Sequence, residues 1–300
     1  MYGKENLASK KLWYSMVTDI KHIQEHLLAM RKPMEDSASP YSSRNSSKGA
    51  MLTEAKILFS YLAKGNSLDS ARRGVFQDNI FGKKTYQTRK KCWIVLHSRY
   101  FPKSEGLEQI HPIIALFRSK ASEKIKEGVL CYHFATSDLF SYEATTELIY
   151  DLYRQGLFNI APRNIHEFLD LKKKVHPEIS KWSPQTRLSL VSHYLSAMRD
   201  FGILEGKNQK KIHRPTVEED LFLYIVTYLR DCGKSPRAIL VSNDFKLFLL
   251  SQQEVELKLL EAQRSGRIKF QKAGHIVSLE LPWRSILEYI ESIGQQIRRA

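Results

Sequence analysis

The sequence predicts a mainly α-helical protein of several modules, with helix–turn–helix or winged-helix units and short β-hairpin wings. Along most of its 300 residues, apolar side chains recur at the three- and four-residue spacing of amphipathic helices. Short apolar–polar alternation around turn residues near 201–215 and 267–281 is typical of β-hairpins. A net charge of +15 and a pI near 9.6 favour a polyanionic partner.

The first module, residues 1–49, consists of an amphipathic helix over 1–32 and a Ser-rich segment. The segment Pro33–Gly49 contains two prolines and many serines, so we expect a flexible linker. His22 and His26 are four residues apart, a spacing that zinc ligands can have. The motif is not HExxH, because the Glu is displaced, and exposed polar histidines are expected instead.

The second module, residues 50–104, is predicted to be a helix–turn–helix unit of three helices. The first helix ends at Gly65-Asn66, a favourable C-terminal pair. Ser67 caps the second helix, and Thr85 begins the third. Residues 105–160 follow as a slightly acidic helical spacer rich in aromatic side chains.

Residues 161–217 predict a winged-helix-like module. Asn164 is expected to cap a first helix, and Ser183-Pro184 opens a long second helix with a strong start signal. The hairpin pattern after this helix would form the wing.

Residues 218–300 predict a C-terminal helical module with a hairpin. A helix over Gln252–Arg264 precedes that hairpin, so the order helix then hairpin occurs twice in the chain. Asp244 with Glu256 and Lys258 forms a D…ExK pattern of the kind found in magnesium-dependent nucleases. Glu256 and Lys258 lie in a helical period, where positions i and i+2 point apart, so this pattern does not favour a nuclease.

The positive charge is concentrated in two blocks. Residues 51–104 carry a net +8 and residues 161–217 a net +6, whereas residues 105–160 carry −3. Each basic block contains the string Gln-Thr-Arg at the start of a helix that follows a shorter helix and a turn. Helix–turn–helix proteins place the first residues of their second helix against base edges in the major groove.

The side chains of these two strings suit DNA. Gln pairs with adenine, Arg with guanine, and Thr with phosphate or a thymine methyl group. Lysines and arginines around both strings would contact phosphates. The predicted DNA-binding residues are Lys83, Lys84, Gln87, Thr88, Arg89, Lys90 and Lys91 in the first block, and Lys181, Gln185, Thr186, Arg187, Lys207, Lys210, Lys211 and Arg214 in the second.

The order of four segments resembles the BrxA family of the BREX bacteriophage-exclusion systems. These segments are LAKGNSLDSARR with TYQTRKK, then YHFATSDLFSYEATTELIYDLY, then WSPQTRLSLVSHYLSAMRDFGILEG, then SNDFKLFLLSQQEVELKLLEAQRSGRIKFQKAGHIVSLE. The resemblance covers most of residues 50–282. It implies a mostly helical, non-enzymatic protein that binds DNA through helix–turn–helix or winged-helix modules and acts in phage defence.

The expected partners are therefore double-stranded DNA and other BREX proteins, without a cofactor, a metal or membrane insertion. No apolar run reaches membrane length, and three widely spaced cysteines fit a reducing cytoplasm. No Walker lysine loop, GxSxG turn or GxGxxG turn is present. A protein–protein adaptor and a structured-RNA binder remain as alternatives.

Overall fold

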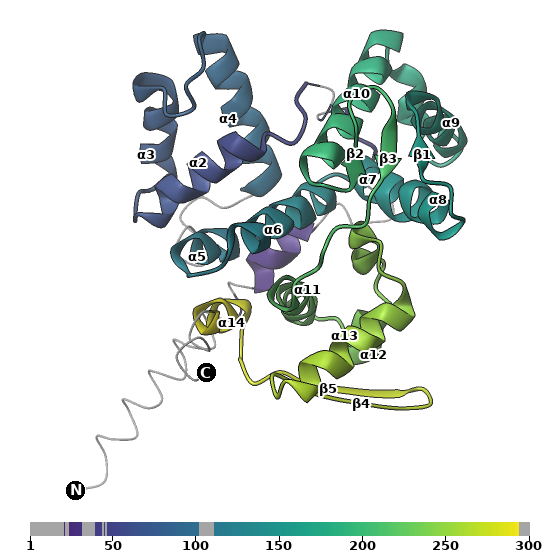
Figure 1. Cartoon of the computed structure of the whole chain (residues 1–300). Coiled ribbons are helices and arrows are strands. Elements are labelled where there is room, and N and C mark those ends of the chain that lie inside the picture. Colours follow the sequence, from purple (N-terminus) through teal and green to yellow (C-terminus); the bar gives the residue numbers. More distant parts are fainter. Residues whose placement is uncertain are drawn as a thin grey trace, which may run out of the picture.

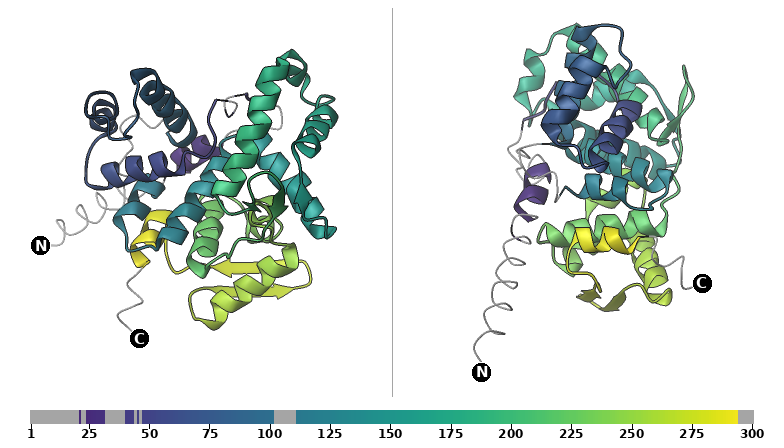
Figure 2. Two further views of the ribbon diagram at one scale, coloured as in Figure 1. Left: turned by 45° about the horizontal axis from the view of Figure 1, so that its top comes forward. Right: turned by 90° about the vertical axis from the view of Figure 1, so that its left-hand side faces the viewer.

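The computed structural model describes residues 21, 24–31, 40–43, 45, 47–101 and 111–293. Helices predominate and the strands form two small sheets, which confirms the predicted mainly α-helical class. Two groups of helices stand side by side on one side of a central layer of helices, and a third group lies on the opposite side (Figure 1; Figure 2). One continuous cluster of buried apolar side chains runs through all of these parts.

The first group, which we call the α4 head, is a three-helix unit. Its elements are α2 (Leu52–Ala63), α3 (Leu68–Arg73), a π-helical turn over Gly74–Asp78, and α4 (Tyr86–Tyr100). The hydroxyls of Ser67 and Thr85 cap α3 and α4, which confirms both predicted helix starts. Tyr100, at the far end of α4, is buried and its hydroxyl donates to the Leu130 carbonyl oxygen at 3.4 Å, so the start of α4 is the end that points outward.

The second group, the α10 head, combines helices with a small sheet. Its elements are β1 (Asn159–Ile160), α9 (Pro162–Lys172), a 3₁₀ helix over Pro177–Lys181, α10 (Pro184–Asp200), β2 (Leu204–Glu205) and β3 (Lys210–Ile212). The predicted hairpin after α10 is confirmed as β2 and β3. The sheet order is β1-β3-β2 with antiparallel pairs, so β1 extends the hairpin from a part of the chain that precedes α9.

The prediction that Asn164 caps the first helix of this head is wrong. Helix α9 begins at Pro162 with Ala161 as its N-cap, and Asn164 is the third helical residue. The Asn164 Oδ1 atom accepts a hydrogen bond from the Ala161 backbone N–H at 2.9 Å. Proline suits the first helical position because its φ is already helical and its missing N–H has no partner there.

The central layer supports both heads. Its elements are α5 (Pro112–Arg118), α6 (Glu123–Thr136), α7 (Leu139–Glu143), a π-helical turn over Ala144–Ile149, α8 (Tyr150–Arg154), α11 (Glu219–Asp231) and α14 (Ile286–Ser292). Every residue of α11 from Leu221 to Leu229 is buried. A helix that is buried on all sides must be covered by neighbours on all sides, which is why the most apolar stretch of the chain lies in the middle layer.

The third group, the C-terminal unit, repeats the order helix, helix, hairpin. Its elements are α12 (Pro236–Leu240), a 3₁₀ helix over Asn243–Phe248, α13 (Gln252–Arg264), β4 (Lys269–Ala273) and β5 (Ile276–Glu280). The predicted helix and hairpin are both confirmed. Strands β4 and β5 pair only with each other in the described part of the chain.

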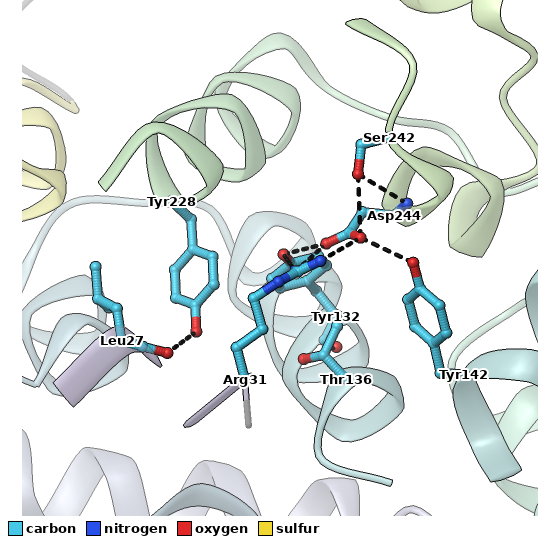
Figure 3. Close-up of polar contacts among 8 residues, drawn as sticks. All are labelled: Leu27, Arg31, Tyr132, Thr136, Tyr142, Tyr228, Ser242 and Asp244. Carbon is cyan, nitrogen blue, oxygen red and sulfur yellow. Dashed lines mark hydrogen bonds and ion pairs between the residues drawn. The ribbon is translucent and has the colours of Figure 1, made fainter. Parts of the chain in front are cut away.

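A helix over residues 24–31 is fastened to the C-terminal unit by a buried ion pair (Figure 3). The Arg31 guanidinium donates to both carboxylate oxygens of Asp244, at 2.8 Å for the Nη2–Oδ1 contact. The hydroxyls of Tyr132 and Tyr142 donate to the same carboxylate at 2.5 and 2.9 Å. Although burial raises the pKa of Asp244, the hydrogen bonds and charge of Arg31 and the two tyrosines lower it overall.

Two expectations for the N-terminal module are wrong in the described residues. His26 is buried, not exposed, because its helix packs against the central layer and its ring lies 5.0 Å from that of His111. Burial lowers the pKa of His26 to about 4. The Ser-rich segment is not a free linker where it is described, since Tyr41 and Asn45 are buried. His22 and residues 32–39 lie outside the described residues.

No described helix is both long enough and apolar enough to span a bilayer.

Candidate nucleic-acid interface

Helices α4 and α10 begin with the same capping arrangement. The Thr85 hydroxyl accepts a hydrogen bond from the Thr88 backbone N–H at 3.2 Å, and the Ser183 hydroxyl accepts one from Thr186 at 3.1 Å. In both helices the cap hydroxyl also lies 2.9 Å from the hydroxyl of that threonine. The two Gln-Thr-Arg strings therefore occupy the second to fourth positions of both helices.

This geometry gives the threonine of each string a structural role. The hydroxyls of Thr88 and Thr186 are hydrogen-bonded to their caps, so both residues hold the helix start together. Gln87 and Gln185 are exposed at the ends of their helices. The Gln185 amide nitrogen donates to the Ser189 hydroxyl at 3.2 Å, a contact within α10.

The arginine of the first string lies in a cluster of aromatic rings at the tip of the α4 head. The Arg89 guanidinium carbon is 5.9 Å from the centre of the half-exposed Tyr86 ring. The centres of the Tyr86 and Phe76 rings are 5.5 Å apart. The Arg72 guanidinium carbon lies 5.9 Å from the centre of the Phe76 ring. The cluster of Arg72, Phe76, Tyr86 and Arg89 was not predicted from the sequence, because Phe76 reaches α4 only through the tertiary fold.

The arginine of the second string is instead tied to the neighbouring helix. The Arg187 Nη2 atom donates to Asp170 Oδ1 on α9 at 2.7 Å. Hydrogen bonds from Lys173 and Arg187 lower the pKa of Asp170. The Arg187 side chain therefore links α9 to α10, and only a fifth of it is exposed.

The predicted lysines of the α4 head divide into one bound residue and three available ones. Lys83 forms an ion pair with Glu54, whose hydrogen bond raises the lysine pKa. Lys84, Lys90 and Lys91 are exposed and pair with no acidic side chain in the described part of the chain. Lys84 directly precedes the N-cap of α4, and Lys90 and Lys91 lie in its second turn, so all three belong to the outward end of the helix.

The predicted cations of the α10 head are more constrained. Lys181, Lys207 and Lys211 are exposed and form no ion pair within the described residues. The Lys210 ammonium donates to the Lys207 carbonyl oxygen at 2.9 Å, and burial next to Arg199 lowers its pKa. Arg214 is exposed and pairs with Glu254 of α13 at 2.6 Å, so it links the hairpin side of this head to the C-terminal unit.

A groove of about 820 Å³ runs between α10, the start of α9 and the turn of the hairpin. The α10 side chains that line it are mostly uncharged, both polar, such as Gln185 and Ser189, and apolar, such as Leu188. Its cations come from the hairpin side, at Lys207 and Lys210, and from Arg199. A phosphate in this groove would therefore contact the hairpin.

The structure brings the predicted residues together within each head, and it places both heads on the same side of the central layer (Figure 1; Figure 2). The Gln-Thr-Arg strings are not buried in apolar packing, since Gln87 and Gln185 are exposed. Acidic partners of the bound cations, such as Glu54 and Asp170, were not predicted, because they come from neighbouring helices.

The D…ExK residues do not meet. Asp244 is completely buried against Arg31, whereas Glu256 pairs with Lys272 on β4. The Lys258 ammonium donates to the Val217 carbonyl oxygen at 3.0 Å. In the described part of the chain no three histidine, cysteine or acidic side chains are grouped as metal ligands would be.

A family model for BrxA matches residues 39–227, which is more than half of the chain. The chain belongs to the BrxA family. BrxA membership makes it a component of a BREX phage-defence system. No curated protein matches the chain. A crystal structure of an uncharacterized protein from Magnetospirillum magneticum shares its fold with a TM-score of 0.53 at 13% identity, over 70% of this chain and 99% of that one.

Proposed function

We propose that this BrxA-family protein binds double-stranded DNA through its α4 and α10 heads as a non-enzymatic, cytoplasmic component of its defence system. The observation that carries the proposal is the group of exposed lysines at the outward end of α4: Lys84, Lys90 and Lys91. Cations near a helix start are unfavourable to the helix dipole, so their concentration there has a cost in stability. An anionic ligand offsets that cost.

The order of elements in the α10 head supports the same function. A strand, a helix, a second helix and a hairpin follow one another, and the first strand pairs with the second strand of the hairpin. This is the order of a winged-helix domain, in which the second helix reads the major groove and the wing contacts the backbone. Lys207 and Lys211 lie on the hairpin β2-β3, which takes the place of the wing, where phosphate contacts are expected.

A second function, docking of another BREX protein, is favoured by the C-terminal unit. It has the same helix-and-hairpin order but begins its long helix with Gln252, Gln253 and Glu254, without clustered lysines. It exposes large apolar side chains: Val241, Leu257 and Ile276. Exposed apolar side chains suit a protein surface better than a phosphate backbone.

The test of DNA binding is duplex affinity measured by fluorescence anisotropy at several salt concentrations. Arg89→Glu with Lys90→Glu is expected to weaken binding at least tenfold and to flatten its salt dependence, because phosphate contacts are lost. Arg237→Glu with Arg264→Glu makes the same charge change at exposed residues of the C-terminal unit and serves as the control.

Three outcomes separate the candidate functions. If the two double variants lost affinity equally, only net charge would matter. That result would contradict direct DNA contact by the α4 head. Stronger competition by folded RNA than by duplex DNA would favour the RNA alternative. A complex with another BREX protein that survives nuclease treatment and both charge changes would support the docking function.

A further inference from the structure

The segment that precedes α2 lies, where it is described, between the two heads and contacts both. We call the described part of this segment, residues 40–43, 45 and 47–50, the strap. The strap leads into α2, the first helix of the α4 head (Figure 1). Its contacts are made by buried side chains and backbone groups, not by loose surface pairs.

One end of the strap is fixed to the α10 head by Tyr41. The Tyr41 ring stacks on His176 with 4.0 Å between centres, and its backbone N–H donates to Glu178 Oε1 at 2.5 Å. Both partners belong to the connection between α9 and α10. The Tyr41 hydroxyl donates to Glu143 of α7 at 2.6 Å, so the same residue is also held by the central layer.

The other end is fixed to α4 by Arg99. The buried Arg99 guanidinium donates to the Ala50 and Gly49 carbonyl oxygens at 2.9 and 3.2 Å and to Asn45 Oδ1 at 2.8 Å. It lies 4.5 Å from the centre of the Phe134 ring on α6. A buried charge with this many partners fixes its surroundings, because each lost partner would leave a desolvated donor.

The strap also touches α10 directly at Gly49. A Cβ atom added there would lie 3.4 Å from the His193 carbonyl oxygen and 3.9 Å from the Ala197 nitrogen. A branched side chain would therefore push the strap and α10 apart. The backbone at Gly49 is thus held by Arg99 of α4 on one side and packed against α10 on the other.

The middle of the strap is tied to the central layer. The Asn45 amide nitrogen donates to Asp138 Oδ2 and to the Ser141 hydroxyl, both at 3.1 Å. Asp138 caps α7 through the Ser141 backbone N–H. Asn45 thereby joins Arg99 of α4 to the start of α7.

We propose that the strap, with Arg99 and Gly49 as positioning residues, sets the separation and orientation of α4 and α10 so that both heads engage one DNA duplex together. The inference rests on the proposed DNA binding. Two linked sites gain affinity for one ligand only when their geometry permits simultaneous contact, and the gain is about 100-fold or more when it does. The strap supplies that geometry without touching the DNA.

The test is affinity as a function of duplex length, measured with the full chain on duplexes from about 8 to 30 base pairs. For the wild-type protein we expect affinity to rise at least tenfold, in one step, at the duplex length that allows both heads to bind the same duplex. In Gly49→Val and Arg99→Gln the step is expected to disappear, while affinity for the shortest duplex that binds stays within twofold of wild type.

Arg31→Gln is the matched control. It removes an equally buried guanidinium, but one that ties the helix over 24–31 to the C-terminal unit, so the length step should persist. A step retained in both strap variants would overturn the proposal, as would a wild-type protein that binds DNA without any step. Absence of binding to every duplex would instead refute the proposed function itself.

A second measurement needs no DNA and covers the case in which a variant binds poorly. Spin labels at Lys91→Cys and Ser192→Cys, both exposed, report the distance between α4 and α10; the native cysteines are buried. We expect one narrow distance distribution, and a broadened or shifted one after Gly49→Val. An unchanged distribution in that variant would contradict the positioning role.

Discussion

The α4 and α10 heads begin their outward helices with the same three residues, yet the two arginines have different environments. Arg89 lies over the exposed Tyr86 ring, whereas Arg187 is bound to Asp170 of the neighbouring helix. The side chains around the two arginines also differ in charge. Exposed lysines gather at the start of α4, while the groove along α10 is lined mainly by side chains without a charge, both polar and apolar.

This difference separates the repeated string into a threonine that helps to cap its helix and an arginine whose environment depends on the head. The threonine and its cap have the same geometry in both heads, with 2.9 Å between hydroxyls, so this part of the repeat follows from helix capping. The arginine and the lysines around it are where the heads diverge. We therefore expect α4 to supply most of the electrostatic attraction to DNA and α10 to contribute through the hairpin β2-β3.

The largest expected effect comes from reversing three charges in one head at a time. Lys84, Lys90 and Lys91 changed to Glu should weaken duplex binding about 100-fold or more and reduce the slope of log K against log salt by roughly 2.7, since each phosphate contact contributes about 0.9. Lys181, Lys207 and Lys211 changed to Glu should cost about tenfold. Anisotropy titrations from 50 to 200 mM salt compare the two, and equal losses would remove the proposed division between heads.

Acid should weaken the α4 head before the α10 head. His111 at the base of the α4 head contacts the Tyr100 carbonyl oxygen at 2.9 Å, and burial holds its pKa well below the ordinary value. Burial also lowers the pKa of His26 to about 4 and that of His133 to about 3. The folded state then binds fewer protons than the unfolded state, so stability is complete above about pH 6.5 and falls as the pH drops toward 4.

For His26 alone the loss amounts to about 3 kcal/mol at the acid end of this range, at 1.4 kcal/mol per pKa unit. Hydrogen exchange followed by mass spectrometry at pH 7.5 and 5 should show protection lost first in peptides of α2 and α4. His26→Gln should reduce the acid sensitivity. Uniform loss across both heads would show that the buried histidines destabilise the whole core and not one head.

We expect Arg89 to contribute mainly to DNA affinity and Arg187 mainly to the stability of the fold. Arg89→Ala is expected to weaken DNA binding about tenfold with little effect on unfolding, because Arg89 has only a cation–π contact within the described fold. Arg187→Ala should change affinity less and lower the midpoint of unfolding, because it leaves Asp170 without the link from α10. Denaturant unfolding and anisotropy on the same samples test both, and the reverse pattern would make Arg187 the reading residue.

Helix starts and hairpins were predictable from the sequence because they depend on local chemistry. Ser67, Thr85 and Ser183 cap the expected helices, and both hairpins form where turn residues interrupt apolar alternation. Asn164 was misplaced because a proline two residues earlier can start the same helix, which makes two local signals compete.

Long-range contacts were not predictable from the same information. Arg31 pairs with Asp244 across 213 positions, and Asn45 meets Asp138 across 93. A serine-rich segment with two prolines has the composition of a linker, and its composition does not reveal that Tyr41 and Asn45 have buried partners. For the same reason the sequence could place Arg187 on a helix start without showing that Asp170 binds it.

The smallest expected effect comes from removing the helix caps, which have the same geometry in both heads. Thr85→Ala and Ser183→Ala each remove one cap hydroxyl and should destabilise their helix by about 1 kcal/mol. Because the geometry is the same in both heads, the two costs should agree within a few tenths of a kcal/mol, whereas charge changes in the two heads should not agree. Urea unfolding of each single variant measures the costs. If removal of one cap hydroxyl destabilised the protein much more than removal of the other, the threonine would have different roles in the two heads. The two strings would then share a sequence but not a structural function.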